Sequence, residues 1–301
     1  MKEDIGLLQK LVRSYTFYSP IQKGKYRLSD LAISLSRKLP GEIIIKTTDG
    51  RELLIDTANG SYKYLYFVGE YEPAISSIFK EIIKPGDICL DIGANIGWYT
   101  TLFQKLVGNE GEVHAFEPVP PIFERLKRNV ELNEPPENVK LNYFALGNVE
   151  KNIDLHIFPD LPNGHASIST FDHKDFEVFP CRMITLDSYL SKNNIENVNL
   201  VKIDIEGAEL MMLKGASRLF SQSRLPIFEI EMALATTRGF NYLPNDLIEY
   251  IGNQADYDFF AIDERYAGLR RIEGFDPEDI GANVLCLPRN FDDNKISKWL
   301  T

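Results

Sequence analysis

The sequence predicts an α/β fold built on a mostly parallel sheet and preceded by an extension of helices and a hairpin. Between residues 72 and 262, short apolar strands alternate with amphipathic helices, the pattern of βαβ units with right-handed crossovers. A glycine-rich loop follows the first of these strands and opens a helix. The last two strands, 257–262 and 283–288, have no helix between them, so we expect the final strand to return antiparallel.

The first 70 residues are expected to form the extension, and residues 71–301 the main domain. Apolar residues at spacings of three and four predict helices near 5–12 and 28–35. Asp49-Gly50 lies between two short apolar runs, 42–46 and 52–56, which is a strong hairpin signal. The aromatic residues that follow are expected to pack this extension onto the core, with a carbohydrate-stacking wall as the alternative. They are Tyr62, Tyr64, Tyr66, Phe67 and Tyr71.

The elements of the main domain follow from the apolar periods and from the residues that interrupt them. Lys84-Pro85-Gly86 ends the first helix, and residues 148–180 are polar and expected to be irregular apart from one strand. The predicted helices are 74–83, 97–106, 122–132, 186–190, 208–220 and 244–252. The predicted strands are 87–92, 112–116, 139–144, 153–158, 199–204, 226–231, 257–262 and 283–288.

Composition excludes several classes of protein. The chain has 33 Lys and Arg against 44 Asp and Glu, so its net charge of −11 argues against a nucleic-acid partner and against docking on an anionic membrane. No apolar run approaches the ~20 residues of a membrane-spanning helix, and the first residues do not read as a signal peptide. Three unpaired cysteines and four scattered histidines predict free thiols, a cytoplasmic location and no zinc site.

The loop Asp91–Gly97 and the acid that follows it predict a nucleoside site. Glycines let the backbone turn tightly and let a ligand approach main-chain N–H groups. Glu117 stands 20 residues after Gly97, at the tip of the next strand, where a carboxylate can accept hydrogen bonds from a ribose diol. The loop reads GxNxG instead of GxGxxG, which disfavours a dinucleotide and favours S-adenosylmethionine. An ordinary strand–helix turn with a solvated Glu117 is the alternative.

A second cluster of charges lies at the end of the strand 199–204. The period of a strand would place Lys202, Asp204 and Glu206 on one face, at the same sheet edge as the glycine loop. Charges between apolar residues are costly unless they are paired or functional, so either a structural ion pair or a catalytic group is indicated. A divalent ion held by Asp204, Glu206 and Glu229 is possible, but the spacing does not demand it.

Together these motifs resemble the FkbM-type family of S-adenosylmethionine-dependent methyltransferases. The resemblance rests on DIGANIGWYT, FEP and LVKIDIEGAE, with GEYEP, FALGN, TLDSYL and LKGASRLF in support, and covers about residues 65–231. It implies a class I methyltransferase (Rossmann-like) fold with a seven-stranded sheet. It also implies O-methylation of a hydroxyl on a sugar, glycan or secondary metabolite, with no membrane insertion.

The resemblance also implies roles for single residues. Asp91, Gly93, Asn95 and Gly97 would hold the methionine end of the cofactor, and Glu117 its ribose. Ala94, Pro118 and the stretch from Asn142 to Ala145 complete the expected cofactor contacts. Lys202, Asp204 and Glu206 would line the methyl-transfer site. Asp204 is the first candidate for the general base and His165 the second, because the ordinary pKa of histidine suits that role.

Two other functions remain open at this point. An NAD-dependent oxidoreductase would need GxGxxG, which the loop lacks. A non-catalytic nucleoside-binding or scaffold protein could keep the same fold, because a fold alone does not establish activity.

Overall fold

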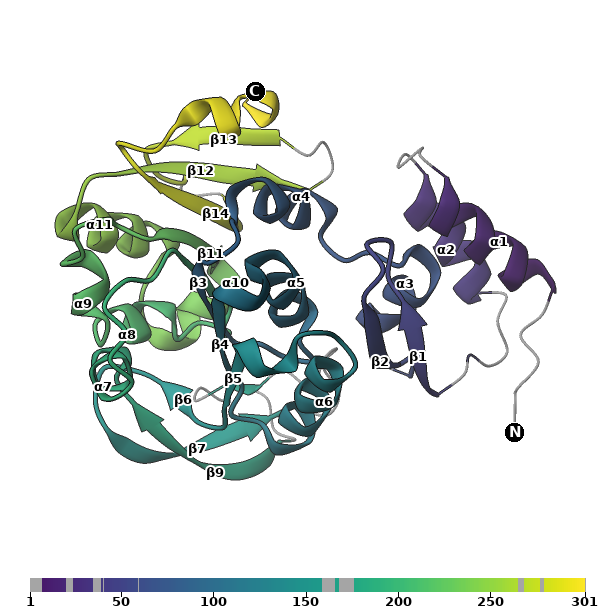
Figure 1. Cartoon of the computed structure of the whole chain (residues 1–301), viewed down its shortest axis with the longest axis horizontal. Coiled ribbons are helices and arrows are strands. Elements are labelled where there is room, and N and C mark those ends of the chain that lie inside the picture. Colours follow the sequence, from purple (N-terminus) through teal and green to yellow (C-terminus); the bar gives the residue numbers. More distant parts are fainter. Residues whose placement is uncertain are drawn as a thin grey trace.

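A computed structural model of the chain describes residues 7–19, 24–34, 39, 41–58, 60–158, 166–167, 176–264, 268–276 and 279–300. Its centre is an eight-stranded sheet in the order β13-β12-β14-β11-β10-β3-β4-β5 (Figure 1). The strands are β3 (Ile88–Ile92), β4 (Glu112–Phe116), β5 (Val139–Asn142), β10 (Leu200–Ile203), β11 (Ile227–Ala233), β12 (Tyr257–Asp263), β13 (Gly268–Ile272) and β14 (Gly281–Pro288).

The strand order confirms the class I methyltransferase fold. β3, β4, β5, β10 and β11 are parallel neighbours, whereas β14 runs antiparallel between β11 and β12, as expected for the final strand. The chain moves from β3 outward to β5 and then restarts beside β3 with β10, so the strand order reverses between β3 and β10. Open α/β sheets bind ligands beside the carboxyl ends of the strands at such a reversal.

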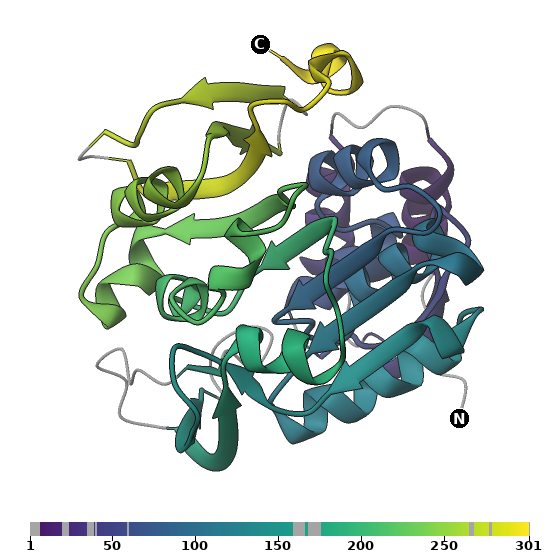
Figure 2. The same cartoon turned by 60° about the vertical axis from the view of Figure 1, so that its left-hand side comes forward.

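Helices cover both faces of the sheet and create two buried cores (Figure 2). Alternate residues of each strand feed the two cores: Cys89 and Leu200 pack on one side, and Leu90 and Val201 on the other. One face carries α4 (Pro73–Ile82), α5 (Trp98–Val107) and α6 (Pro120–Glu131). The other carries α7 (Leu186–Lys192), α8 (Glu209–Leu213), α9 (Ser217–Phe220) and α11 (Pro244–Gln254). Short helical turns complete the chain: α10 (Leu234–Thr237), η1 (Gly108–Glu110), η2 (Pro136–Asn138), η4 (Arg238–Phe240), η5 (Asp293–Lys295) and η6 (Ser297–Trp299).

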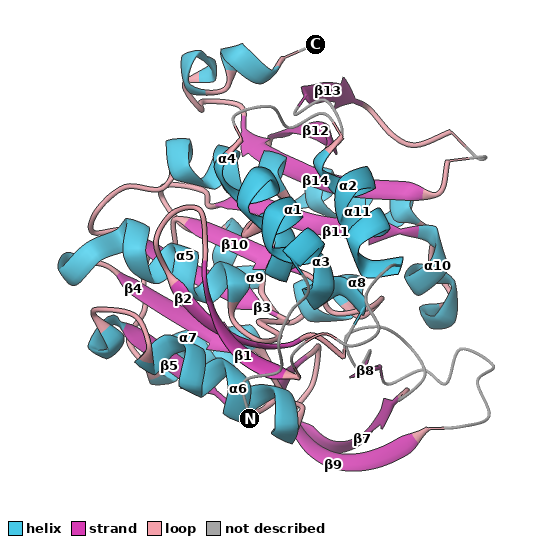
Figure 3. Cartoon of the chain, turned by 90° about the vertical axis from the view of Figure 1, so that its right-hand side faces the viewer, coloured by secondary structure: helices cyan, strands magenta, loops and turns pink. Residues whose placement is uncertain are grey.

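The N-terminal part contains α1 (Leu7–Tyr18), α2 (Lys25–Ser34), the strands β1 (Glu42–Lys46) and β2 (Glu52–Asp56), and α3 (Gly60–Val68). β1 and β2 form the predicted antiparallel hairpin around Asp49-Gly50. In Figure 3 this part faces the viewer, with the hairpin near α6. Side chains of β2 and α3, including Leu53 and Phe67, are buried in the same core as α4 and α5. The division of the chain at residue 70 stays a prediction.

Besides helix α3, which the sequence did not predict, three parts of the chain differ from the prediction. β13 is an eighth strand at the sheet edge, which Arg270 and Arg271 concealed because a charged run does not look like a strand. Residues 208–220 form two helices instead of one, since the Gly215 backbone packs against Gly147 and Asp187 then caps a new helix at Ser217. Residues 148–180 are less irregular than expected, because β7 (Lys151–Ile157) and β9 (Glu177–Ile184) pair antiparallel. They form a second sheet with β6 (Ala145–Leu146) and β8 (Ala166–Ser167).

Two smaller findings concern the cysteines and the helices. Cys89, Cys181 and Cys286 are free and buried, as predicted. None of the described helices combines the length and apolar character that crossing a membrane requires.

Candidate active site

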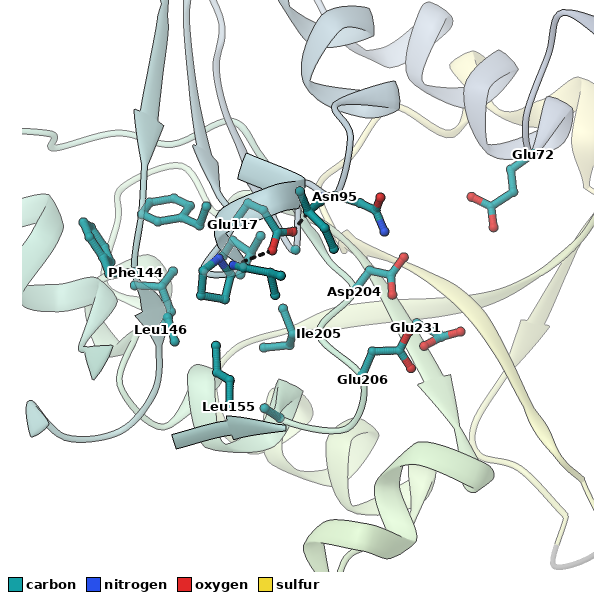
Figure 4. A pocket seen from close by; sticks show the side chains of 18 of the residues that line it. Glu72, Asn95, Glu117, Phe144, Leu146, Leu155, Asp204, Ile205, Glu206 and Glu231 are labelled. Carbon is teal, nitrogen blue, oxygen red and sulfur yellow. Dashed lines mark hydrogen bonds between the residues drawn. The ribbon is translucent and has the colours of Figure 1, made fainter. Parts of the chain in front are cut away.

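A cavity of about 220 Å³ opens at the carboxyl ends of β3, β4, β10 and β11. One end is apolar, and the other carries carboxylates; Figure 4 shows Glu117 between them. The apolar wall is made by Phe116, Val119, Ile122, Phe144, Leu146 and Leu155. The acidic end is made by Glu72, Asp204, Glu206 and Glu231. No Lys, Arg or His lines the cavity among the residues that the structure describes.

The glycine loop reaches this cavity through a tight backbone turn. Gly93 has a φ of 84°, and a Cβ atom placed on it would lie 1.8 Å from the carbonyl oxygen of Asp204. Glycine is therefore required here because the loop packs directly on the end of β10. Asn95 also adopts a left-handed conformation, with a φ of 49°, which asparagine tolerates better than most residues.

Glu117 connects this loop to the strand beside it. Its carboxylate accepts the backbone N–H of Asn95 and of Val119, both at 2.9 Å. The side chain is only 5% exposed, and burial raises its pKa to about 7 in spite of these hydrogen bonds. Because Glu117 lines the cavity and each carboxylate oxygen has a second lone pair, it can still accept hydrogen bonds from a ligand.

Lys202 lies under the acidic end of the cavity. The strand register places it beside Asp91 of β3 and Glu229 of β11. Its ammonium group lies 2.9 Å from Asp204 Oδ2, 3.9 Å from Glu229 Oε2 and 4.7 Å from the centre of the Tyr99 ring. Burial alone would lower the pKa of Lys202, but the surrounding carboxylates, Asp204 first, hold it well above its usual range. Lys202 is therefore a paired, buried cation.

The other carboxyl groups around this lysine hold protons more tightly than usual. Burial raises the pKa of Glu229 to about 8, and neither of its oxygens has a hydrogen-bond partner among the described residues. Repulsion by Asp204, followed by burial, raises the pKa of Glu231 to about 9. Burial raises the pKa of Glu72 to about 7, although Glu72 accepts a hydrogen bond from the Tyr99 hydroxyl at 2.5 Å. At neutral pH the cluster is thus partly protonated.

The structure brings many of the predicted residues to the cavity wall. These are Gly93, Asn95, Glu117, Pro118, Ala145, Asp204 and Glu206. Ala94 and Lys202 instead line a smaller neighbouring cavity of about 70 Å³, which shares Tyr71, Gly93, Asn95 and Asp204 with the first. Lys202, Asp204 and Glu206 do not share one strand face as expected. The strand β10 ends at Ile203, and Glu206 lies in a turn with a φ of 55°.

Three predicted residues lie behind the wall, and a fourth is not described. Asp91 is buried and accepts a hydrogen bond from Thr100 at 2.5 Å. Gly97 is the N-cap of α5, and Asn142 holds the backbone of β4 and β5 through Ala115 and Glu117. His165 lies outside the described residues.

Sequence reasoning missed Glu72 as a cavity residue and, of the apolar wall, assigned only the stretch 142–145, which includes Phe144. Glu72 belongs to the GEYEP motif, which could have marked it, but its direction depends on a left-handed φ of 43° before α4. The alternation in β11 predicts that Glu231 shares one face with Glu229, where either could hydrogen-bond an acceptor hydroxyl, and Glu231 does line the cavity. The described residues contain no group of three or more His, Cys, Asp or Glu arranged to hold a metal ion.

Comparison with known proteins identifies the family of this chain. The model of the methyltransferase FkbM domain matches residues 91–259. The hexuronic acid methyltransferase AglP of Haloferax volcanii is 28% identical over 159 residues, which cover 53% of this chain and 62% of that protein. The methyltransferase sdnD of Sordaria araneosa is 28% identical over 177 residues, 46% of this chain and 67% of that protein. The 2-O-methyltransferase NoeI of Sinorhizobium fredii is 26% identical over 157 residues, which cover 47% of this chain and 62% of that protein.

The chain thus spans about three fifths to two thirds of the length of these relatives. Among solved structures, the methyltransferase FkbM from Methylobacillus flagellatus aligns with a TM-score of 0.43 and 16% identity, covering 75% of this chain and 52% of that one. The family model covers more than half of the chain, including the glycine loop, Glu117 and the end of β10. The protein therefore belongs to the FkbM methyltransferase family.

Proposed function

We propose that this protein is an S-adenosylmethionine-dependent O-methyltransferase that acts on a hydroxyl of a sugar, glycan or secondary metabolite. The observation that carries the proposal is the order of groups along one cavity, from the apolar wall through Glu117 to the carboxylates (Figure 4). This order matches the adenine, ribose diol and sulfonium of S-adenosylmethionine. That molecule, when bound, supplies an electrophilic methyl group.

The residues present fit this cofactor better than a dinucleotide. Phe144, Leu146 and Ile122 offer apolar surface to an adenine ring, and Glu117 offers an acceptor to a ribose diol. The acidic end suits a sulfonium cation and would repel a diphosphate. Gly93 supports this assignment indirectly, since its contact with Asp204 keeps the glycine loop at the cavity edge.

Asp204 is proposed as the group that accepts the proton of the acceptor hydroxyl. Its side chain is 38% exposed and lines both cavities, so an acceptor could reach it. Lys202 fixes one of its oxygens at 2.9 Å and leaves the other available. Glu231 is protonated at neutral pH because of its raised pKa of about 9, so it can donate a hydrogen bond to an acceptor oxygen. Holding the acceptor in line with the reacting carbon provides much of the expected acceleration.

The charge of the cavity limits which acceptor compounds can bind. Four carboxyl groups line the acidic end, and the buried cation beneath them, Lys202, is already paired with Asp204. An acceptor with its own carboxylate or phosphate would meet repulsion there, whereas an uncharged hydroxyl compound would not. The relative AglP is named for hexuronic acid, a sugar that carries a carboxylate, so the acceptor proposed here resembles that compound as a sugar and differs from it in charge. We therefore propose an uncharged sugar or polyol hydroxyl as the acceptor.

Calorimetry and a turnover assay test this proposal. The protein should bind S-adenosylhomocysteine more tightly than NAD; the reverse order would overturn the cofactor assignment. With methyl-labelled S-adenosylmethionine and a pool of glycans and small metabolites, label should appear in an uncharged hydroxyl compound. Binding without any turnover would instead support the non-catalytic nucleoside-binding protein.

Replacing Asp204 by asparagine tests the base. Asp204→Asn keeps the shape of the side chain and removes the proton acceptor, so turnover should fall by about 10²- to 10⁴-fold. Affinity for S-adenosylhomocysteine should change little. Full activity would move the role to His165, which His165→Asn would then test. An equal loss of affinity and rate would mean that Asp204 holds the cofactor instead of activating the acceptor.

A further inference from the structure

The glycine loop is held from outside the segment that the family model matches. That match begins at residue 91, whereas Arg51, Leu54 and Tyr62 come from the hairpin and α3 that precede it. Each of these three residues is hydrogen-bonded to the loop or to a side chain that holds it. The N-terminal part therefore contributes to the geometry of the site.

Arg51 anchors the far end of the loop. Its side chain is 2% exposed and donates to the Trp98 carbonyl at 2.6 Å and to the Thr101 hydroxyl at 2.7 Å. The guanidinium also lies 4.3 Å from the centre of the Trp98 ring, and Asp49 neutralises it at 2.9 Å. A buried, neutralised arginine at the start of α5 fixes this helix relative to the hairpin.

Asn129 of α6 ties the middle of the loop to β2. Its amide nitrogen donates to the carbonyls of Ile96 at 2.7 Å and Leu54 at 3.2 Å. Its amide oxygen accepts the Leu54 N–H at 2.6 Å, so β2 and the loop share one fully buried side chain. Loss of β2 would leave these polar groups unpaired.

Tyr62 of α3 makes the contact closest to the proposed ribose site. Its hydroxyl donates to Asn95 Oδ1 at 2.6 Å, and the same oxygen accepts the Ile96 N–H at 2.8 Å. Asn95 in turn donates its own N–H to Glu117 Oε2 at 2.9 Å. Burial raises the pKa of Tyr62 far above its ordinary value, so the hydroxyl stays protonated and remains a donor.

We propose that Tyr62 is a positioning residue for the cofactor site, holding Asn95 in its left-handed conformation so that Asn95 fixes the Glu117 carboxylate. The assignment rests on the proposed function only in that Glu117 binds the cofactor. Asn95 costs conformational energy at a φ of 49°, and two hydrogen bonds to its side chain offset that cost. Without the Tyr62 hydroxyl, the Asn95 N–H is no longer held in the position from which it donates to the Glu117 carboxylate.

Removing one hydroxyl group tests this. Tyr62→Phe keeps the ring and should weaken S-adenosylhomocysteine binding by about three- to tenfold, the effect of losing one hydrogen bond, while kcat at saturating cofactor changes by less than about twofold. Tyr64→Phe is the matched control: Tyr64 lies on the same helix, and its hydroxyl donates to Asp30, away from the loop. That variant should bind like the unmodified protein.

A double-mutant cycle separates positioning from general loosening. In the Glu117→Gln background, Tyr62→Phe should weaken binding less than it does in the unmodified protein, because the single amide oxygen of glutamine cannot accept both the Asn95 and the Val119 N–H groups as the carboxylate does. Asn95→Gly tolerates the same φ and removes the acceptor oxygen, so it should weaken binding as Tyr62→Phe does, and the two changes should not add.

The outcomes distinguish this inference from the proposed function. If the unmodified protein does not bind S-adenosylhomocysteine, the proposed function fails. If it binds and Tyr62→Phe binds equally well, only the role of Tyr62 is refuted. Equal weakening by Tyr64→Phe, or full additivity with Glu117→Gln, would also overturn the positioning role.

Discussion

Two turns at the ligand edge of the sheet are built around buried glutamates, Glu117 after β4 and Glu209 after β10. Both side chains are almost inaccessible, at 5% and 0% exposed, and burial raises the pKa of each to about 7. Each accepts two backbone N–H groups: Glu117 those of Asn95, in the neighbouring glycine loop, and Val119, and Glu209 those of Ile205 and Gly207. By burial, pKa and hydrogen bonding the two look alike.

They differ in what lies beyond the carboxylate. Glu209 accepts the Tyr242 hydroxyl at 2.8 Å with its other oxygen and does not line the cavity. Glu117 faces the cavity between its apolar and acidic ends. Of these two buried acids with raised pKa values, only Glu117 has open space in front of its carboxylate, so only Glu117 is placed to meet a ligand. Glu209 instead shapes the turn that carries Glu206.

The largest expected effect comes from Gly93, where the glycine loop that Glu117 holds packs against Asp204 at the start of the turn after β10. Gly93→Ala would place a methyl group 1.8 Å from the Asp204 carbonyl oxygen at a φ of 84°. Strain and overpacking together should cost about 3–5 kcal/mol of unfolding free energy in urea denaturation. Gly86→Ala is the matched control, since Gly86 has a φ of 86° and no atom within 4 Å of the added methyl. It should cost about 1 kcal/mol; equal losses would mean that the contact with Asp204 is not tight.

Most of the fold could be predicted from the sequence, because the buried face of a strand or helix carries apolar residues at a regular spacing. The hairpin strands matched their predicted bounds, since Asp49-Gly50 fixes the turn between two apolar runs. The helix α3 was missed because Leu65, Tyr66, Phe67 and Val68 are all buried, which erases the one-sided pattern of a surface helix.

The candidate site was predictable where a motif fixes a backbone position. Asn95 and Glu117 follow from the loop and the strand tip, and both line the cavity. At the acidic end Asp204 and Glu206 were predicted for the site, whereas Glu72 was missed because it reaches the cavity through a left-handed backbone conformation that a periodic pattern does not show. Nothing local indicated that Glu117 and Glu209 would differ, since the difference depends on Tyr242, which is distant in sequence.

The next comparison replaces each glutamate by alanine. Glu209→Ala would leave the Ile205 and Gly207 N–H groups without their acceptor in a sealed turn and would remove one of the two acceptors of the Tyr242 hydroxyl, so unfolding free energy should fall by about 2–4 kcal/mol. Glu117 faces the cavity, where water can replace its carboxylate, so Glu117→Ala should lower the unfolding free energy by less. Its loss of S-adenosylhomocysteine binding should be about 1.5–3 kcal/mol, as for a hydrogen bond to a charged group. Urea denaturation and calorimetry on both variants check this, and a larger binding loss in Glu209→Ala would reverse the assigned roles.

The last comparison is the dependence of stability and binding on pH. Both glutamates have a folded pKa of about 7 against an ordinary 4.5, so the folded state binds the proton more tightly than the unfolded state. The stability that each contributes is fully present below about pH 4.5 and is lost as pH rises through about 7. Glu117→Gln and Glu209→Gln should each flatten the fall in unfolding free energy between these values.

Ligand binding should respond to only one of the two carboxyl groups. An ionised Glu117 has acceptor oxygens only, which suits a ribose diol, so affinity for S-adenosylhomocysteine should rise from pH 6 to pH 8. Calorimetry across that range should show the rise in Glu209→Gln, after correction for unfolding, and its loss in Glu117→Gln. A rise that persists in Glu117→Gln and disappears in Glu209→Gln would show that the sealed carboxylate, not the one facing the cavity, senses the ligand. In that case the effect of Glu209 on binding would have to pass through Tyr242. The hydroxyl of Tyr242 joins Glu209 to the carbonyl of Gly207, in the turn beside the cavity.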